Sequence, residues 1–251
     1  SEPNKLARSS DGQFIYVGLD GAAAVRRVNV ATQQADLQFS LGFGQFSTGP
    51  LFVEDMEAVP GEPNAVAISR RNAGFSPRHE GVAIYDNGVK RPTTTANHTG
   101  SNVIEFSANA STLYGMNNET TEFGFRKMAV DSLGVTVTQV TSNVFSGFNI
   151  NFEVDNGRAY STSGRVIDPE TAAPLGLFAN ISFGNLVLPD SSVGRTFFIS
   201  GTDASDSTVN ATIVIRAFDQ NTFVPLGSLN VDGVNGRVKS AVRWGTNGLA
   251  I

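Results

Sequence analysis

Residues 6 to 18 read Leu6-Ala7-Arg8-Ser9-Ser10-Asp11-Gly12-Gln13-Phe14-Ile15-Tyr16-Val17-Gly18, and this stretch decides the fold. Short apolar segments stand on either side of Asp11-Gly12, a dipeptide that favours tight hairpin turns. The pattern therefore predicts two antiparallel strands joined by a turn. Related patterns return several times along the chain, which indicates a repeat protein. A small sheet cannot bury both of its faces alone, so we expect the repeats to stack.

The rest of the 251-residue chain keeps this β-type periodicity. No window of ten or more residues has apolar positions at helical spacing, whereas period-two segments rich in Val, Ile, Phe and Tyr are frequent. The fold predicted is all-β, a β-propeller of four-stranded antiparallel blades that forms a single domain over residues 1–251. We predict five blades and part of a sixth, at approximately residues 5–41, 51–95, 102–140, 150–178, 186–229 and 238–251.

The sixth unit stops at Ile251, partway into its second strand. Complete propellers usually pair strands from both chain ends in one blade, because ring closure removes exposed sheet edges. Neither terminus supplies the two missing strands of this unit. We therefore expect an incomplete ring and a chain that is part of a longer polypeptide.

Composition excludes several classes of partner and site. The net charge is −5 and no basic block is present, which argues against nucleic acid as a partner. No apolar run reaches the roughly 18 to 20 residues that span a bilayer, so no membrane span is expected. The absence of cysteine excludes disulfides and thiolate metal sites but does not fix the compartment.

Three segments of the first unit resemble the YVTN-type propeller repeat of bacterial surface-layer-like and lactonase-like proteins. These segments are Ser10-Asp11-Gly12, Ile15-Tyr16-Val17-Gly18 and Val28-Asn29-Val30-Ala31-Thr32. The resemblance covers one blade closely, while the other units keep only the rhythm of strand, turn and strand. It implies the propeller fold and says little about activity.

A second resemblance is to uncharacterised multi-repeat proteins of bacteria, which are generally exported. It rests on Val82-Ala83-Ile84-Tyr85-Asp86-Asn87-Gly88, Tyr160-Ser161-Thr162-Ser163-Gly164 and Arg243-Trp244-Gly245-Thr246-Asn247-Gly248-Leu249-Ala250. This resemblance implies an extracellular, periplasmic or cell-envelope location in a bacterium and does not imply a reaction.

Both histidines fall where propeller ligands usually bind. In a four-stranded blade, the loop between the second and third strands and the link to the next blade emerge at the same rim. His79 lies in the long loop that we expect at residues 72–80, and His98 lies in the link at residues 96–101. Two neighbouring imidazoles could bind a divalent metal or act as a base, because imidazole ligates as the neutral ring. The alternative is that each ring only packs or hydrogen-bonds locally.

Charged side chains near these histidines complete the candidate rim site. Besides His79 and His98, the candidate ligand-binding residues are Arg71, Arg78, Glu80 and Glu122. Glu54, Asp55 and Glu119 add carboxylates at the same rim, where a pair could serve as acid and base if burial separated their pKa values. The spacing does not require that role.

A separate metal candidate is the loop at residues 202–210, which contains Asp203 and Asp206. Their oxygen atoms suit Ca²⁺, although the EF-hand spacing is missing and a solvated acidic loop explains the same residues. Apart from such a divalent metal, no cofactor is predicted.

The function predicted is a non-catalytic binding or scaffold domain that presents its rim loops to a protein or glycan partner. The alternative is a metal-dependent, lactonase-like hydrolase or lyase with its site on the rim. A quinone-cofactor dehydrogenase is a third alternative, but its tryptophan-docking repeats are missing from a chain whose one tryptophan is Trp244. An enzyme requires convergent titratable groups around one pocket, whereas a binding module requires exposed aromatic and arginine side chains.

Overall fold

The computed structural model describes residues 1–45, 49–181, 186–201, 211–234 and 238–251. This described part forms strands β1 to β22, with one short 3-10 turn at Asp20–Ala22 and no α-helix. The strands form five four-stranded antiparallel sheets and one two-stranded sheet. The prediction of an all-β fold with five four-stranded blades and part of a sixth is therefore confirmed. None of the described residues form a helix long and apolar enough to cross a membrane.

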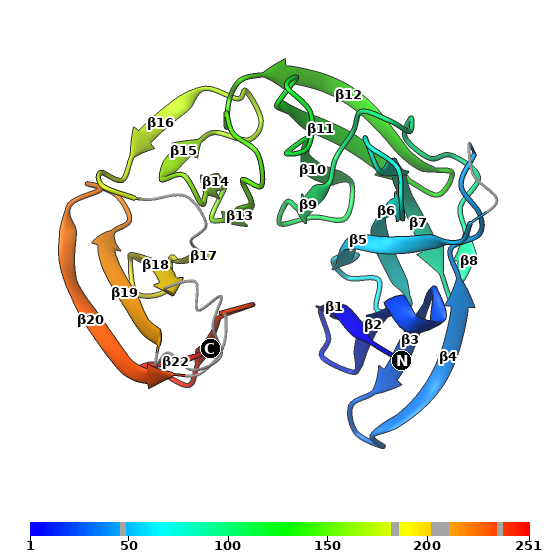
Figure 1. Cartoon of the computed structure of the whole chain (residues 1–251), viewed down its shortest axis with the longest axis horizontal. Coiled ribbons are helices and arrows are strands. Elements are labelled where there is room, and N and C mark those ends of the chain that lie inside the picture. Colours follow the sequence, from blue (N-terminus) through cyan, green and yellow to red (C-terminus); the bar gives the residue numbers. More distant parts are fainter. Residues whose placement is uncertain (46–48, 182–185, 202–210, 235–237) are drawn as a thin grey trace. The chain divides into compact units, whose positions relative to one another are not determined.

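The first compact unit comprises Ser1–Phe148 and contains three blades. In each blade the strands follow one another in chain order, and the first strands of neighbouring blades contact one another (Figure 1, blue to green). The strands are β1 (Pro3–Arg8), β2 (Phe14–Leu19), β3 (Ala24–Asn29), β4 (Gln34–Ser40), β5 (Leu51–Ala58), β6 (Ala65–Asn72), β7 (His79–Asp86), β8 (Val89–Lys90), β9 (Val103–Phe106), β10 (Thr112–Met116), β11 (Gly124–Asp131) and β12 (Gly134–Ser142).

The second compact unit comprises Asn149–Ile251 and contains two blades and a two-stranded sheet. Its blades have the same meander topology as those of the first unit. The strands are β13 (Phe152–Asp155), β14 (Arg158–Ser161), β15 (Arg165–Ile167), β16 (Pro174–Leu177), β17 (Leu186–Asp190), β18 (Arg195–Gly201), β19 (Ala211–Asp219), β20 (Pro225–Val234), β21 (Val242–Trp244) and β22 (Gly248–Ala250).

Asn-Gly dipeptides close two of the hairpins. Asn87 and Gly88 have φ values of 46° and 80°, and Asn156 and Gly157 have φ values of 47° and 72°. Two successive residues with positive φ define the type I′ geometry, whose twist matches that of the flanking strands. These two dipeptides thus fix the strand register of their hairpins locally.

Alternation along β6 builds the interior of the first unit. Val66 and Ile68 pack in one cluster with side chains of the first blade, including Tyr16. Ala65 and Ala67 point to the other face and pack with side chains of the third blade. Successive side chains of a strand point to opposite faces, so the middle blade is buried on both sides.

Aromatic packing dominates the interior of the second unit. Phe178 is 1% exposed and its ring meets those of Phe198, Phe218 and Phe223 edge to face, at centroid distances of 5.0 to 5.2 Å. Such edge-to-face pairs add stability beyond the area that they bury. Four of the chain's 18 phenylalanines thus pack together in the interior of this unit.

One strand differs from its predicted place. The second blade is predicted to extend to about residue 95, but its outer strand β8 covers only Val89–Lys90. Pro92 has no amide proton to donate. After it, the Thr93 amide donates to the Leu133 carbonyl at 2.7 Å, and the Thr93 carbonyl accepts from the Val135 amide at 3.2 Å. Thr93 therefore pairs with the edge of the third blade and does not continue the outer strand of the second blade.

Candidate functional site

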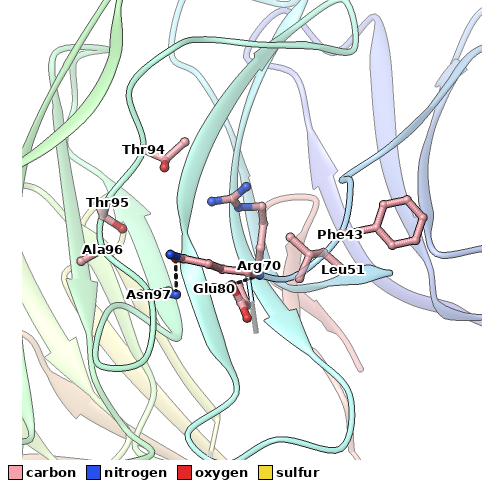
Figure 2. Close-up of a pocket in the computed structure, with 9 residues that line it drawn as sticks. Phe43, Leu51, Arg70, Glu80, Thr94, Thr95, Ala96 and Asn97 are labelled. Atoms are coloured by element: carbon pink, nitrogen blue, oxygen red, sulfur yellow. Dashed lines mark hydrogen bonds between the residues drawn. The ribbon is translucent and has the colours of Figure 1, made fainter. Parts of the chain in front are cut away.

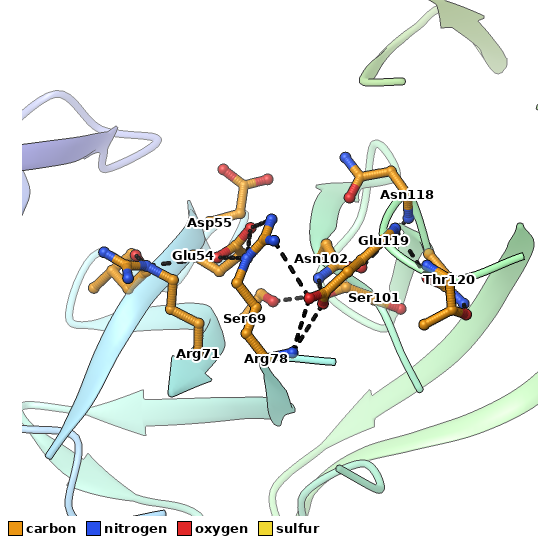
Figure 3. A network of polar contacts seen from close by, with 12 residues as sticks. Glu54, Asp55, Ser69, Arg71, Arg78, Ser101, Asn102, Asn118, Glu119 and Thr120 are labelled. Atoms are coloured by element: carbon orange, nitrogen blue, oxygen red, sulfur yellow. Dashed lines mark hydrogen bonds and ion pairs between the residues drawn. The ribbon is translucent and has the colours of Figure 1, made fainter. Parts of the chain in front are cut away.

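The loops between the second and third strands of the first three blades lie at the same end of the first unit. They comprise the turn at Asp20–Ala22 and the loops at residues 73–78 and 117–123. The links between blades start and finish at this end as well, so charged residues far apart in sequence come together here (Figure 3). We call this end the loop end.

A β-bulge places Glu54 at the centre of the loop end. Val53 pairs with Arg70 and Asp55 pairs with Ser69, so Glu54 is the extra residue of β5. A bulge changes the direction of a side chain relative to its neighbours, and bulges are frequent beside functional sites. Here it turns the Glu54 carboxylate toward two arginines, Arg71 and Arg78 (Figure 3).

Arg78 joins two carboxylates of neighbouring blades. Its Nε and Nη2 donate to both oxygens of Glu54 at 2.6 to 3.0 Å. Its backbone amide donates to both oxygens of Glu119 at 2.9 and 3.0 Å, and its Nη1 lies 3.4 Å from Glu119 Oε1. Hydrogen bonding to Glu54 raises the pKa of Arg78 against the effect of burial. The loop at residues 73–78 is thus tied to both sides.

Arg71 extends this array to the first blade. Its Nη2 donates to Asp20 Oδ2 at 2.7 Å, and its Nε lies 3.5 Å from Glu54 Oε2. The result is an alternating series of five charges from three blades, Asp20, Arg71, Glu54, Arg78 and Glu119, which we call the ion-pair chain. Because each member has a partner of opposite sign, the array holds its side chains in place without a large net charge.

A double-mutant cycle tests how strongly the ion-pair chain is coupled. Glu54→Gln and Arg78→Gln, alone and together, should show a coupling of about 1 kcal/mol in the free energy of unfolding, because the pair is bidentate but the Arg78 side chain is 34% exposed. Urea unfolding of the four proteins measures this coupling. The exposed pair of Arg26 and Gln38 provides the control cycle and should couple less. Additive single effects at Glu54 and Arg78 would contradict the prediction.

His79 is the first residue of β7 and does not lie in the loop where we predicted it. The strand begins earlier because the Asn72 amide donates to the Arg78 carbonyl and His79 pairs with Arg71, which shortens the loop to residues 73–78. The His79 side chain is 2% exposed and neither ring nitrogen has a hydrogen-bond partner among the described residues. Burial, followed by the nearby charges of Arg126 and Arg70, lowers the pKa of His79 to about 3.

The two histidines are neighbours through their backbones. The His98 amide donates to the His79 carbonyl at 2.8 Å, so the predicted proximity of these two segments is present. The side chains have different surroundings, since that of His98 is exposed and its Nδ1 lies 3.0 Å from Thr99 Oγ1. Within the described ranges, no group of three or more His, Asp or Glu side chains is placed to hold a metal ion.

Glu122 belongs to an ion pair of the third blade. Its carboxylate accepts from Arg126 Nη2 at 2.7 and 2.9 Å and from Asn117 Nδ2 at 2.8 Å. Burial opposes ionisation of Glu122, but these hydrogen bonds outweigh it and hold the pKa below its ordinary value. The loop with Asp203 and Asp206 lies outside the described residues, so the Ca²⁺ hypothesis stays a prediction.

A pocket of about 240 Å³ opens beside Arg70 at the loop end of the second blade. A second bulge builds it: Arg70 on β6 lies opposite both Glu80 and Gly81 on β7, and Gly81 has a φ of 83°. The links before and after the second blade complete the wall (Figure 2). The lining residues are Phe43, Gln45, Leu51, Arg70, Glu80, Thr94, Thr95, Ala96 and Asn97, and we call the space the Arg70 pocket.

Exposed phenylalanines also gather at the loop end. Phe43, Phe75 and Phe148 are 72%, 48% and 57% exposed, and all three lie in links or loops of this end. The Phe148 ring packs edge to face on Phe123 of the loop at residues 117–123, at 5.1 Å.

Sequence reasoning placed several of these residues at one rim and missed others. Asp20 was not among the candidates, although it stands in the corresponding loop of the first blade and the same rim rule applies to it. Gln45 and Asn97 could not be recognised, because amides in links carry no pattern. Their contact in space, with Asn97 Nδ2 donating to Gln45 Oε1 at 2.9 Å, depends on the approach of two separate links.

Comparison with known proteins supports the fold and leaves the family open. No protein-family model matches the sequence, and a search of curated proteins gives no match either. Among solved structures, the chain is similar to one described as dihydro-heme d1 dehydrogenase NirN in complex with DHE, with a TM-score of 0.56 and 11% identity. The match covers 92% of this chain and 57% of that one. At this identity the likeness shows the β-propeller class of fold and no activity.

Proposed function

We propose that this chain is a binding domain of the bacterial cell envelope or extracellular space, which recognises a protein partner through its loop end. The location is supported by the resemblance to exported bacterial repeat proteins. A glycan is the other partner class that fits a propeller rim, and the test below separates the two.

The observation that carries the proposal is the segregation of exposed aromatic side chains. Among the described residues of the first unit, the exposed large apolar side chains in the loops and links of the loop end are Phe43, Phe75 and Phe148, whereas the opposite end exposes the aliphatic Val30, Val89 and Leu133. Aromatic residues and arginine are enriched among the residues that dominate binding energy at protein interfaces. Arg78 lies in the same loop as Phe75 and adds a partly exposed guanidinium.

The ion-pair chain suits such a surface. Loops presented on a rigid scaffold lose less conformational entropy on binding than free loops do. Glu54 and Glu119 hold the loop at residues 73–78 from two sides, so its aromatic side chain is presented from a fixed base.

Site-specific crosslinking tests the proposal. A photoreactive phenylalanine analogue is placed at Phe75 or Phe148, and at Val89 as the matched control on the opposite end, in cells of the source bacterium. We expect protein adducts from the first two positions and not from Val89. The captured protein, once purified, should bind Phe75→Ala and Phe148→Ala at least about tenfold more weakly than the parent chain. Adducts from Val89 alone, adducts with polysaccharide alone, or none at either loop position would overturn it.

The metal-dependent hydrolase or lyase remains the second candidate, because the backbones of His79 and His98 are hydrogen-bonded. Metal analysis of the purified chain by mass spectrometry separates the two functions. One divalent metal per chain that is lost in His79→Ala and His98→Ala would favour the enzyme. A substoichiometric content unaffected by these substitutions would favour the binding domain.

A further inference from the structure

Four arginines of the first unit are at most 9% exposed, and three of them have carboxylate partners within the unit. Arg27 pairs with Asp36 at 3.0 Å, Arg91 with Glu62 and Asp86 at 2.7 and 2.8 Å, and Arg126 with Glu122 at 2.7 Å. The fourth, Arg70, is 7% exposed and has no carboxylate within 4.0 Å among the residues that the structure describes. Buried charges are as a rule paired, because removal from water is costly.

The contacts of Arg70 account for only part of its hydrogen-bonding capacity. Nε donates to the Gly81 carbonyl at 3.2 Å, and the guanidinium also interacts with the Tyr85 hydroxyl. Both acceptors are neutral, and a guanidinium has five N–H donors in a planar fork. This fork matches the two oxygens of a carboxylate.

The Arg70 pocket lies where the missing counter-ion would sit. Arg70 forms part of the lining of this 240 Å³ space, which is large enough for a small acid or one acidic side chain and too small for a folded segment. We propose that the Arg70 pocket binds a carboxylate group, with the Arg70 guanidinium as its counter-ion. The inference stands on the pocket and does not require that the partner be a protein.

The other lining residues narrow the chemistry of the ligand. Glu80 brings a carboxylate to the same space, so a dianion such as phosphate is repelled more than a singly charged group. Glu80 also accepts hydrogen bonds, which favours a ligand that carries a hydroxyl or amide donor beside its carboxylate. Asn97 and Gln45 also line the pocket and offer neutral donors and acceptors.

The neighbouring His79 does not supply a counter-ion for Arg70. This ring has no hydrogen-bond partner among the described residues, and burial, followed by the charges of Arg126 and Arg70, disfavours its protonation. Arg126 is neutralised by Glu122, whereas Arg70 is not. An anion bound at Arg70 would give this arginine a negatively charged partner, as the other three buried arginines of the unit already have.

The first experiment uses the free chain and needs no ligand. Arg70→Met removes a buried charge that has no partner, so the urea midpoint should stay the same or rise. Arg91→Met removes a buried charge that has two carboxylate partners, so the midpoint should fall. A fall in the midpoint of Arg70→Met as large as that of Arg91→Met would overturn the proposal, because it would show that Arg70 already has its counter-ion.

The second experiment measures binding by NMR titration. The probes are acetate, glucuronate and the amide of N-acetylglutamate, which represent a free acid, an acidic sugar and a protein side chain. Acetamide, glucose and the amide of N-acetylglutamine are their neutral controls, and inorganic phosphate is the dianion. We expect at least one carboxylate to bind and to lose about tenfold or more in affinity in Arg70→Gln, with Arg26→Gln unchanged.

The outcomes of this titration are distinct from those of the crosslinking. Equal affinity of the parent chain and Arg70→Gln for every carboxylate, or no binding up to the solubility limit of the probes, would overturn the carboxylate site while leaving the protein-binding proposal standing. Binding of glucuronate alone would assign the ligand to acidic sugars. Binding of the glutamate amide alone would assign it to an acidic side chain of a protein.

Discussion

Replacement of Gly134 by alanine is expected to lower the free energy of unfolding by about 3 kcal/mol or more. Gly134 has a φ of 136°, and a Cβ atom there would lie 2.0 Å from the Thr93 carbonyl oxygen. That oxygen belongs to the backbone and accepts from the Val135 amide, so it cannot move away without breaking the contact between the second and third blades. Strain and overlap therefore act together at this position.

Gly227→Ala is the matched control for this substitution. Gly227 has a φ of 155°, and no atom lies within 4 Å of the place that its Cβ would occupy. Gly227→Ala should therefore lower the free energy of unfolding by only about 1 kcal/mol, because alanine is strained in this backbone conformation but does not collide with another atom. Urea unfolding of both variants gives the comparison. Equal losses at the two positions would show that Thr93 does not constrain Gly134 and that the second blade is not anchored there.

The contact at Thr93 shows where prediction of the fold from sequence stops. Turn dipeptides such as Asn87-Gly88 and the alternation of apolar residues specify hairpins locally, and hairpins in sequence make a four-stranded blade. The place where the outer strand leaves its own sheet is not local. It depends on Pro92, which is visible in the sequence, and on an acceptor at Leu133 about forty residues away, which is not.

The candidate site also has a part that the sequence predicts and a part that it does not. Arg71, Arg78 and Glu80 are candidates from sequence because they lie in or next to a loop that the topology of a blade places at one end, and this rule needs only the order of the strands. The bulges at Glu54 and at Glu80 and Gly81 were not predictable, since an extra residue in a strand changes no pattern of hydrophobicity. Yet these bulges decide that Glu54 meets two arginines and that Arg70 faces a pocket.

The stability of the chain is expected to fall by about 2 kcal/mol between pH 7 and pH 5 because of His79 alone. Its pKa is about 3 in the folded chain, against about 6.5 for an unfolded histidine. The folded-state value is the lower one, so the unfolded chain binds more protons throughout this interval. His79 therefore contributes its full stabilisation above pH 6.5 and loses it progressively as the pH falls from 6.5 toward 3.

Urea unfolding at pH 5, 6 and 7 measures this slope. His79→Leu should be much less sensitive to pH over the interval, because leucine has no proton to bind, whatever the substitution does to stability at pH 7. Carboxylates titrate mainly below pH 5, so they contribute little to the comparison.

The same measurement bears on whether His79 acts in chemistry or in packing. A Cβ at Gly100 would lie 2.1 Å from two atoms of the His79 ring, so the ring fills its space against the backbone of the link to the third blade. A base that works near neutral pH needs a pKa near that pH. A strong pH slope in the parent chain that His79→Leu removes would place the pKa of His79 far below the working range of a base. A flat profile in both proteins would mean that the ring is hydrated or bound to a partner, which would return the rim histidines to the list of catalytic candidates.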